Sequence, residues 1–141
     1  MKPLISRRNF VKTTTMAGVA ASIAPTILFG SPSQRLQVGI IGTGFRGQWV
    51  SQLLLNRPDV DIPVICDVDD IMIERVLKIF KKANRPLPKI YKNGPEDFRN
   101  MVANEDLDGV YIATPWEWHH SMAIAAMKNN IHVGTEVPAA L

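Results

Sequence analysis

One segment constrains the fold of this chain more than any other. LQVGIIGTGFRG, from Leu36 to Gly47, runs from an apolar stretch into three glycines at G-x-G-x-x-G spacing. In a strand-turn-helix unit this spacing is typical of a dinucleotide-binding turn. There Gly42 permits the tight turn, Gly44 lets the backbone approach a pyrophosphate, and Gly47 lets the helix pack closely on the strand. The amides at the helix N-terminus then hold the phosphate.

A carboxylate follows at the position that such a turn requires. The second predicted strand, Val60–Cys66, ends at Asp67, twenty positions after Gly47. A carboxylate there accepts both hydroxyls of an adenosine ribose, and its charge repels a 2′-phosphate. Asp67 therefore favours NAD over NADP as the cofactor. The alternative is that Asp67 caps the next helix, a role for which Asp69 is better placed.

The rest of the chain alternates between helical and strand patterns. We expect helices at 47–55, 71–83, 95–104 and 120–130, and further strands near Ile90, at 107–115 and at 131–136. Parallel strands joined by helices form a sheet that is covered on both faces. The sequence thus predicts an α/β fold, a Rossmann-like doubly wound parallel sheet.

Charge and cysteine content exclude several classes of function. Lys2, Arg7, Arg8 and Lys12 are four of the 16 basic residues, and the chain has 13 acidic ones. All four lie in the first twelve residues, which contain no acidic residue. The rest of the chain therefore has 12 basic and 13 acidic residues, an excess of one acidic residue. Nucleic-acid binding therefore loses its main electrostatic support. A single cysteine, Cys66, excludes an internal disulfide and a cysteine-rich zinc site, and we expect no metal.

The N-terminus has the pattern of an export signal. SRRNF, with Arg7 and Arg8, precedes an uncharged, mostly small and apolar segment, Thr13–Gly30. This order of regions is typical of a signal peptide, and the paired arginines resemble a twin-arginine signal. We expect residues 1–33 to be a signal peptide and linker, and residues 34–141 to be a domain exported to the periplasm. A membrane anchor or a disordered tail is the alternative. Because the apolar segment is marginal for a span of about 20 residues, we expect no stable membrane span after processing.

An unusual cluster, ATPWEWHH, follows the predicted strand at 107–115. It falls at the carboxyl edge of the sheet, the edge at which open α/β sheets bind ligands. In one interpretation, Trp116 and Trp118 form an apolar wall, and Glu117 and His119 point polar groups into it. In the other, the tryptophans cap the sheet edge and His120 begins the next helix. The residues alone leave both open.

Three segments, GIIGTGFRG, ICDVD and DGVYIATPWEWHHSMAIAAMKNNIHVGTEVP, together resemble the nucleotide-binding half of the Gfo/Idh/MocA oxidoreductase family over residues 36–138. Within it, the chain is similar to glycoside hydrolase family 109, the NAD-dependent α-N-acetylgalactosaminidases. The P-W-E-W-H motif carries this likeness, as do Glu136 and Val137, where most family dehydrogenases have Glu-Lys-Pro. Pro138 keeps the dehydrogenase-like form.

The resemblance implies cofactor contacts for several of these residues. Phe45 and Arg46 would contact the pyrophosphate, and Asp67 would contact the adenosine ribose. The segment Trp116–His119 would lie in the region that leads to the nicotinamide. Glu136 and Val137 would contact the nicotinamide ribose and ring. Val137 neither donates nor accepts a proton. It therefore cannot assist alcohol oxidation as the lysine of the family dehydrogenases does at this position. We expect no catalytic residue within this chain.

Enzymes of this kind hydrolyse a glycoside by transient oxidation at C3 followed by elimination, with the hydride returned at the end of the cycle. The resemblance implies that a following α+β domain, which these residues do not include, binds the carbohydrate. We therefore expect this chain to be a piece of a longer protein. A homo-oligomer is a further expectation for that protein. The alternatives are a sugar or polyol oxidoreductase that uses NAD(P) and a non-catalytic nucleotide-binding module.

Overall fold

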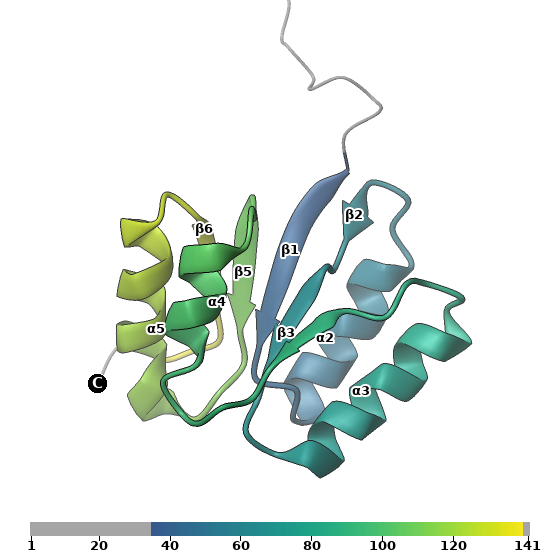
Figure 1. Cartoon of the computed structure of the whole chain (residues 1–141), viewed down its shortest axis with the longest axis horizontal. Coiled ribbons are helices and arrows are strands. Elements are labelled where there is room, and N and C mark those ends of the chain that lie inside the picture. The colour runs from purple at the N-terminus through teal and green to yellow at the C-terminus, as the bar shows by residue number, and fades with distance from the viewer. Residues whose placement is uncertain (1–34, 140–141) are drawn as a thin grey trace, which may run out of the picture. The chain divides into compact units, whose positions relative to one another are not determined.

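In the computed structural model, residues 35–139 are described, and they form a parallel sheet with helices on both faces (Figure 1). The predicted signal peptide and linker, residues 1–33, lie outside the described residues. Within the described range, no helix has both the length and the apolar character needed to cross a membrane.

The sheet is doubly wound, as predicted. Its strands are β1 (Leu36–Ile41), β2 (Val60–Asp61), β3 (Val64–Cys66), β4 (Lys89–Tyr91), β5 (Gly109–Ile112) and β6 (His132–Thr135). They lie in the order β4-β3-β1-β5-β6, with β2 paired to β1, and every pairing is parallel. The chain moves from β1 to one side, crosses back at β5 and moves to the other side. This reversal beside β1 creates the crevice in which doubly wound sheets bind ligands.

The predicted second strand is divided in two. Leu36 pairs with Val60, whereas Ile40 pairs with Ile65, so one extra residue lies on the second strand between these pairs. Pro63 lies at this irregularity and has no amide hydrogen to donate to a ladder. The continuous strand expected at 60–66 is therefore interrupted by a bulge.

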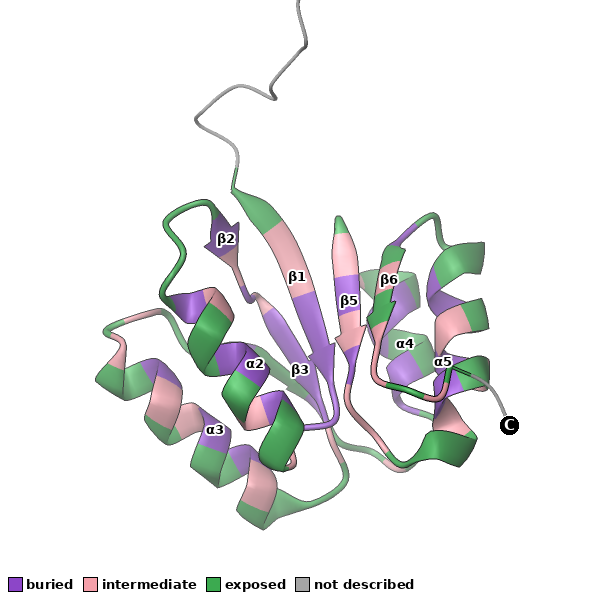
Figure 2. Ribbon diagram, turned by 180° about the vertical axis from the view of Figure 1, so that it is seen from behind, coloured by how far each residue is buried: buried purple, intermediate pink, exposed green. Residues whose placement is uncertain are grey.

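Among the described residues, four helices cover the sheet: α2 (Phe45–Leu55), α3 (Asp70–Lys82), α4 (Phe98–Asn104) and α5 (Trp116–Lys128). Helices α2 and α3 lie on one face and α4 and α5 on the other (Figures 1 and 2). Adjacent residues of β1 face opposite cores, because Ile40 packs with Val50 and Phe80 while Ile41 packs with Met101 and Met122. The alternation of side chains along a strand thus supplies both cores.

Two helix starts differ from the prediction by three residues or more. Helix α4 begins at Phe98 rather than Pro95, after a turn. Helix α5 begins at Trp116, so the expected start at His120 is wrong. Pro115 precedes the first residue of α5, its carbonyl accepts a hydrogen bond from the Trp118 amide, and proline is tolerated at a helix start because no intrahelical donor is needed there.

Candidate functional site

A cavity of about 320 Å³ opens at the carboxyl ends of β1, β3 and β5. The glycine turn, the segment after β3 and the start of α5 all contribute to it. Its lining is mostly apolar and includes Ile41, Gly42, Gly44, Cys66, Asp67, Val68, Met72, Pro95, Thr114, Trp118 and Met122. The glycine turn and the carboxylate predicted from the sequence therefore lie beside one cavity.

The three glycines of the turn meet different steric demands. Gly42 has a φ of +90°, and a Cβ there would lie 2.7 Å from the Ala113 carbonyl oxygen. At Gly47 a Cβ would lie only 1.9 Å from the Gly42 carbonyl oxygen, so α2 packs directly on the turn. Gly44, in contrast, has no atom within 4 Å of its missing Cβ. The space beside Gly44 is open to a ligand, as the motif predicts.

Asp67 is fixed by backbone and side-chain donors. Its Oδ2 accepts from the Thr43 amide at 2.5 Å and the Thr43 hydroxyl at 2.8 Å, and its Oδ1 accepts from the Asp69 amide at 3.0 Å. A carboxylate has about four acceptor positions, so Oδ1 retains capacity for a further donor. Thr43, which is fully buried, is a positioning residue that the glycine pattern did not reveal.

Asp67 does not cap the following helix. The side chain of Asp69 accepts from the amides of Ile71 at 2.8 Å and Met72 at 3.3 Å, and it is the N-cap of α3. The prediction that Asp69 takes this role is confirmed. The carboxylate of Asp67 is thereby left to face the cavity, in the position that fits a ribose hydroxyl.

Arg46, in the first turn of α2, and Glu136, just after β6, contact each other at the carboxyl edge of the sheet. The Arg46 guanidinium donates to both carboxylate oxygens, at 2.9 Å from Nε and 3.3 Å from a terminal nitrogen, and its carbon lies 5.0 Å from the centre of the Trp49 ring. The Tyr111 hydroxyl also donates to Glu136. The hydrogen bonds from Arg46 and then Tyr111 lower the pKa of Glu136. Burial and the hydrogen bond to Glu136 raise the pKa of Tyr111, a residue that the sequence reasoning did not single out.

The cluster Trp116–His119 is the first turn of α5 and points in several directions. Trp118 lines the cavity and packs edge-on against Phe98, with ring centroids 6.4 Å apart. Trp116 and Glu117 are exposed, and His119 is fully buried. The structure therefore does not bring the two tryptophans and the two polar side chains onto one wall, because successive helical residues face different sides.

The other residues predicted to contact the nucleotide are not among those that line the cavity. Phe45 and Val137 are 86% and 81% exposed. Their contacts with a nucleotide, like those of Arg46 and Glu136, stay predictions. Cys66 does line the cavity, but burial first, and then the nearby carboxylates of Asp97 and Asp67, raises its pKa to about 12. Its thiol is therefore protonated and unreactive at neutral pH.

The arrangement fits the adenosine and pyrophosphate parts of a dinucleotide. An open space beside Gly44 meets the N-terminus of α2, and Asp67 offers a fixed acceptor at the end of the next strand. Among the described residues, no group of three histidine, cysteine, aspartate or glutamate side chains is placed to hold a metal ion. The cavity thus has features for binding a nucleotide.

The sequence profile of an oxidoreductase family with an NAD-binding Rossmann fold, Gfo/Idh/MocA, matches residues 36–141. This chain belongs to the Gfo/Idh/MocA oxidoreductase family. The resemblance inferred from the motifs is confirmed, and so is the prediction of an NAD-binding Rossmann domain. The site at the carboxyl edge is the part of the fold that fits this cofactor.

Several curated relatives of the chain are glycosidases by name. A glycosyl hydrolase family 109 protein of Saccharopolyspora erythraea is 41% identical over 128 residues, which cover 91% of this chain and 26% of the relative. An alpha-N-acetylgalactosaminidase of Tannerella forsythia is 39% identical over 155 residues, covering 96% of this chain and 33% of the relative. The chain therefore spans about a third or less of the length of these relatives.

Two solved inositol dehydrogenases have the same fold as this chain. Myo-inositol 2-dehydrogenase of Lactobacillus plantarum has a TM-score of 0.64 at 27% identity, over 77% of this chain and 30% of that one. The scyllo-inositol dehydrogenase of Lactobacillus casei with bound NAD(H) and scyllo-inositol also has a TM-score of 0.64, at 22% identity, over 77% of this chain and 29% of that one. At this identity the second likeness shows the fold alone.

Proposed function

We propose that this chain is the cofactor-binding part of an exported NAD-dependent glycosidase. The observation that carries the proposal is the similarity to glycosyl hydrolase family 109 proteins, at 32% to 41% identity over nearly the whole chain. The residues at the end of β6 support it. Val137 stands where most family dehydrogenases have a lysine, and its side chain cannot transfer a proton.

The residues of this chain bind and orient the cofactor. The amides at the start of α2 hold the pyrophosphate beside Gly44, and Asp67 accepts a hydrogen bond from the adenosine ribose. Trp118 forms part of the apolar lining of the cavity. Bound NAD supplies reversible hydride transfer at a sugar carbon, which permits elimination of the glycosidic substituent and addition of water.

An oxidoreductase acting on a sugar or polyol is the second candidate. Two observations favour it: Pro138 keeps the dehydrogenase-like residue, and myo-inositol 2-dehydrogenase has the same fold at 27% identity. The two candidates differ in their need for cofactor. A glycosidase returns the hydride in each turnover, whereas a dehydrogenase that releases its product consumes one NAD each time.

The two candidates are distinguished by assaying the longest protein that contains this chain. The glycosidase proposal predicts release of aryl alcohol from an aryl N-acetyl-α-galactosaminide, with no net formation of NADH. Net NADH formation from free inositols or sugars, without glycoside cleavage, would establish the oxidoreductase instead. Retained NAD with neither reaction, across aryl α- and β-glycosides, would contradict both and indicate a binding module.

The proposed export rests on Arg7 and Arg8 and on the apolar segment after them. A cofactor that is regenerated in every turnover suits a compartment in which NAD is not supplied. The test is a fusion of residues 1–33 to a reporter that is active only after export in the folded state. We expect export that is lost when Arg7 and Arg8 are both replaced by lysine; export that survives this change would contradict a twin-arginine route.

A further inference from the structure

His119 is the most completely buried titratable side chain at the carboxyl edge, with no exposed surface. It lies in the first turn of α5, and both of its ring nitrogens are engaged. Nδ1 lies 2.8 Å from the Pro138 carbonyl oxygen, and Nε2 lies 2.9 Å from the Thr114 carbonyl oxygen. One imidazole therefore joins three segments: the end of β5, the start of α5 and the segment that follows β6.

Both partners of the ring are hydrogen-bond acceptors. A carbonyl oxygen has no hydrogen to donate, so each contact needs an N–H on the ring. A neutral imidazole has one N–H, whereas the doubly protonated ring has two. In a neutral ring, one nitrogen lone pair would face a carbonyl oxygen in a place that water does not reach, and unpaired buried polar groups are destabilising. The geometry thus selects the doubly protonated ring.

A buried cation is less costly when an anion is near, and among the described carboxylates Glu136 is the one whose pKa the charge of His119 lowers. The charge of His119 contributes to lowering the pKa of Glu136, after the larger effects of Arg46 and Tyr111. Arg46 comes from α2 and Tyr111 from β5, and the other titratable groups in this turn of α5, Glu117 and His120, are exposed. Glu136 is therefore the carboxylate that couples electrostatically to His119.

We propose that His119 is a positioning residue, whose doubly protonated ring holds the Pro138 carbonyl and thereby fixes the segment Glu136–Pro138 at the rim of the cofactor site. The hydrogen bond to Thr114 fixes the ring relative to the end of β5, and the hydrogen bond to Pro138 fixes the segment after β6 relative to the ring. Glu136 then stays within reach of Arg46 and Tyr111. The side chain of His119 itself does not line the cavity.

The first test does not involve NAD, so it is independent of the proposed function. The ring nitrogens of the histidines are observed by NMR in the ligand-free chain at neutral pH. We expect two slowly exchanging ring N–H groups for His119, with both nitrogens in the chemical-shift range of protonated imidazolium. His120, exposed and one residue along the same helix, is the matched control and should show fast exchange. A His119 ring with one unprotonated nitrogen would overturn the proposal.

The second test separates the two hydrogen bonds. An asparagine amide lies near the Nδ1 position of a histidine and a glutamine amide near Nε2, so His119→Asn keeps a donor for Pro138 and His119→Gln keeps one for Thr114. We expect His119→Gln to weaken NAD binding about tenfold, as for the loss of one charge-assisted hydrogen bond, and His119→Asn to weaken it less. His120→Gln is the control and should bind as the unmodified chain does.

The outcomes distinguish positioning from general structural support. If both His119 variants lower thermal stability and NAD affinity equally, the imidazole supports the fold and does not position the rim, and the proposal is overturned. If the unmodified chain binds no NAD, the proposed function fails, and the NMR result still decides the state of His119. A loss of the NMR contacts between Arg46 and Glu136 in His119→Gln alone would support the proposal without any ligand.

Discussion

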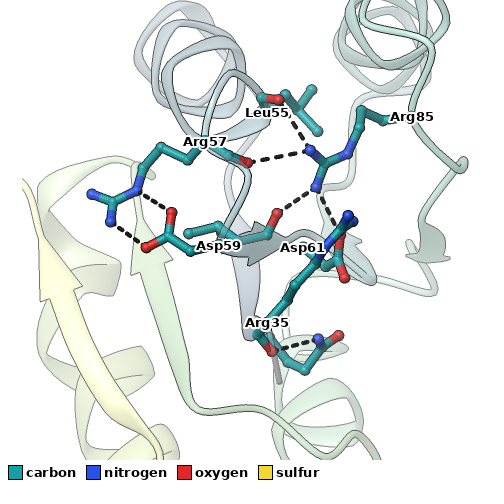
Figure 3. Close-up of polar contacts among 8 residues, drawn as sticks. Arg35, Leu55, Arg57, Asp59, Asp61 and Arg85 are labelled. Carbon is teal, nitrogen blue, oxygen red and sulfur yellow. Dashed lines mark hydrogen bonds and ion pairs between the residues drawn. The ribbon is translucent and has the colours of Figure 1, made fainter. Parts of the chain in front are cut away.

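The two ends of the parallel sheet both carry arginine-carboxylate pairs, and they use them differently. At the amino end, Arg85 donates to Asp61 at 2.7 Å and to the backbone carbonyls of Leu55, Arg57 and Val60, and its side chain is 16% exposed (Figure 3). At the carboxyl end, Arg46 is 52% exposed and has one carboxylate partner.

The difference lies in unused hydrogen-bonding capacity. Arg85 joins the end of α2 to the bulged β2, and its acceptors are backbone groups that require a donor. Arg46 can exchange its partner for another anion at little cost, and Asp67 keeps a free acceptor position beside a cavity. An edge whose polar groups satisfy one another holds the fold, whereas an edge with spare donors and acceptors beside a cavity binds a ligand.

The largest effect is expected within the glycine turn itself. Gly47→Ala places a methyl group against the Gly42 carbonyl oxygen, so α2 must move, and we expect a loss of about 3 kcal/mol in unfolding free energy. Gly44→Ala is the matched control, because its methyl group enters open space. It should change stability by less than about 0.5 kcal/mol but weaken NAD binding. Urea unfolding and NAD titration of both variants test this. Equal stability of the two variants would contradict the packing role of Gly47.

Replacing one arginine at each end of the sheet tests the comparison directly. Arg85→Ala leaves buried carbonyls without a donor and should cost about 2 kcal/mol of stability, with NAD affinity unchanged. Arg46→Ala should do the reverse, with stability little changed and NAD affinity reduced. Thermal unfolding and NAD titration of both variants separate the two effects. A loss of NAD affinity in folded Arg85→Ala would remove the distinction between the two ends.

Replacing each of two neighbouring carboxylates, Asp67 and Asp69, tests which of them binds the ribose. Asp67→Asn removes the charged acceptor, and we expect NAD binding to weaken about tenfold and the preference over NADP to narrow. Asp69→Asn is the control, because asparagine is as good an N-cap as aspartate, and both stability and affinity should be kept. Dissociation constants for NAD and NADP are the readout. Unchanged NAD affinity in Asp67→Asn would rule out its ribose contact.

The smallest effect concerns the ionisation of Glu136. Because Arg46 and Tyr111 lower the pKa of Glu136 in the folded chain, its pairing stabilises the fold fully above the ordinary glutamate pKa. That contribution is lost as the pH falls through the lowered pKa. Glu136→Gln should therefore be less stable than the unmodified chain at pH 7, and the two should converge in acid. Urea midpoints that differ by the same amount at both pH values would contradict this pairing.

The sequence predicted the fold and the centre of the site because both depend on local patterns. The glycine spacing specifies a turn between a strand and a helix, and Asp67 follows the next strand at the expected interval. Parallel strands then bring these two segments together without further information. The capping role of Asp69 could be predicted for the same reason, because its side chain accepts hydrogen bonds from amides no more than three residues away.

What the sequence could not predict depends on side-chain direction and on contacts between distant segments. Thr43 occupies a variable position of the glycine pattern, and its hydroxyl acquires a role only where β1 meets β3. The burial of His119 follows from the start of α5 at Trp116, which sets the direction of every side chain in that turn. The pairing of Arg46 with Glu136 joins residues 90 positions apart and requires the order of the strands.

The most direct test of this account is a calorimetric titration of NAD and of NADP into the chain of residues 1–141, with circular dichroism as the check that it is folded. The account predicts one NAD bound per chain, with NADP bound more weakly and Asp67→Asn impaired. A folded chain that gives neither heat nor a thermal shift with NAD would contradict the central claim that the carboxyl edge of this sheet binds the cofactor.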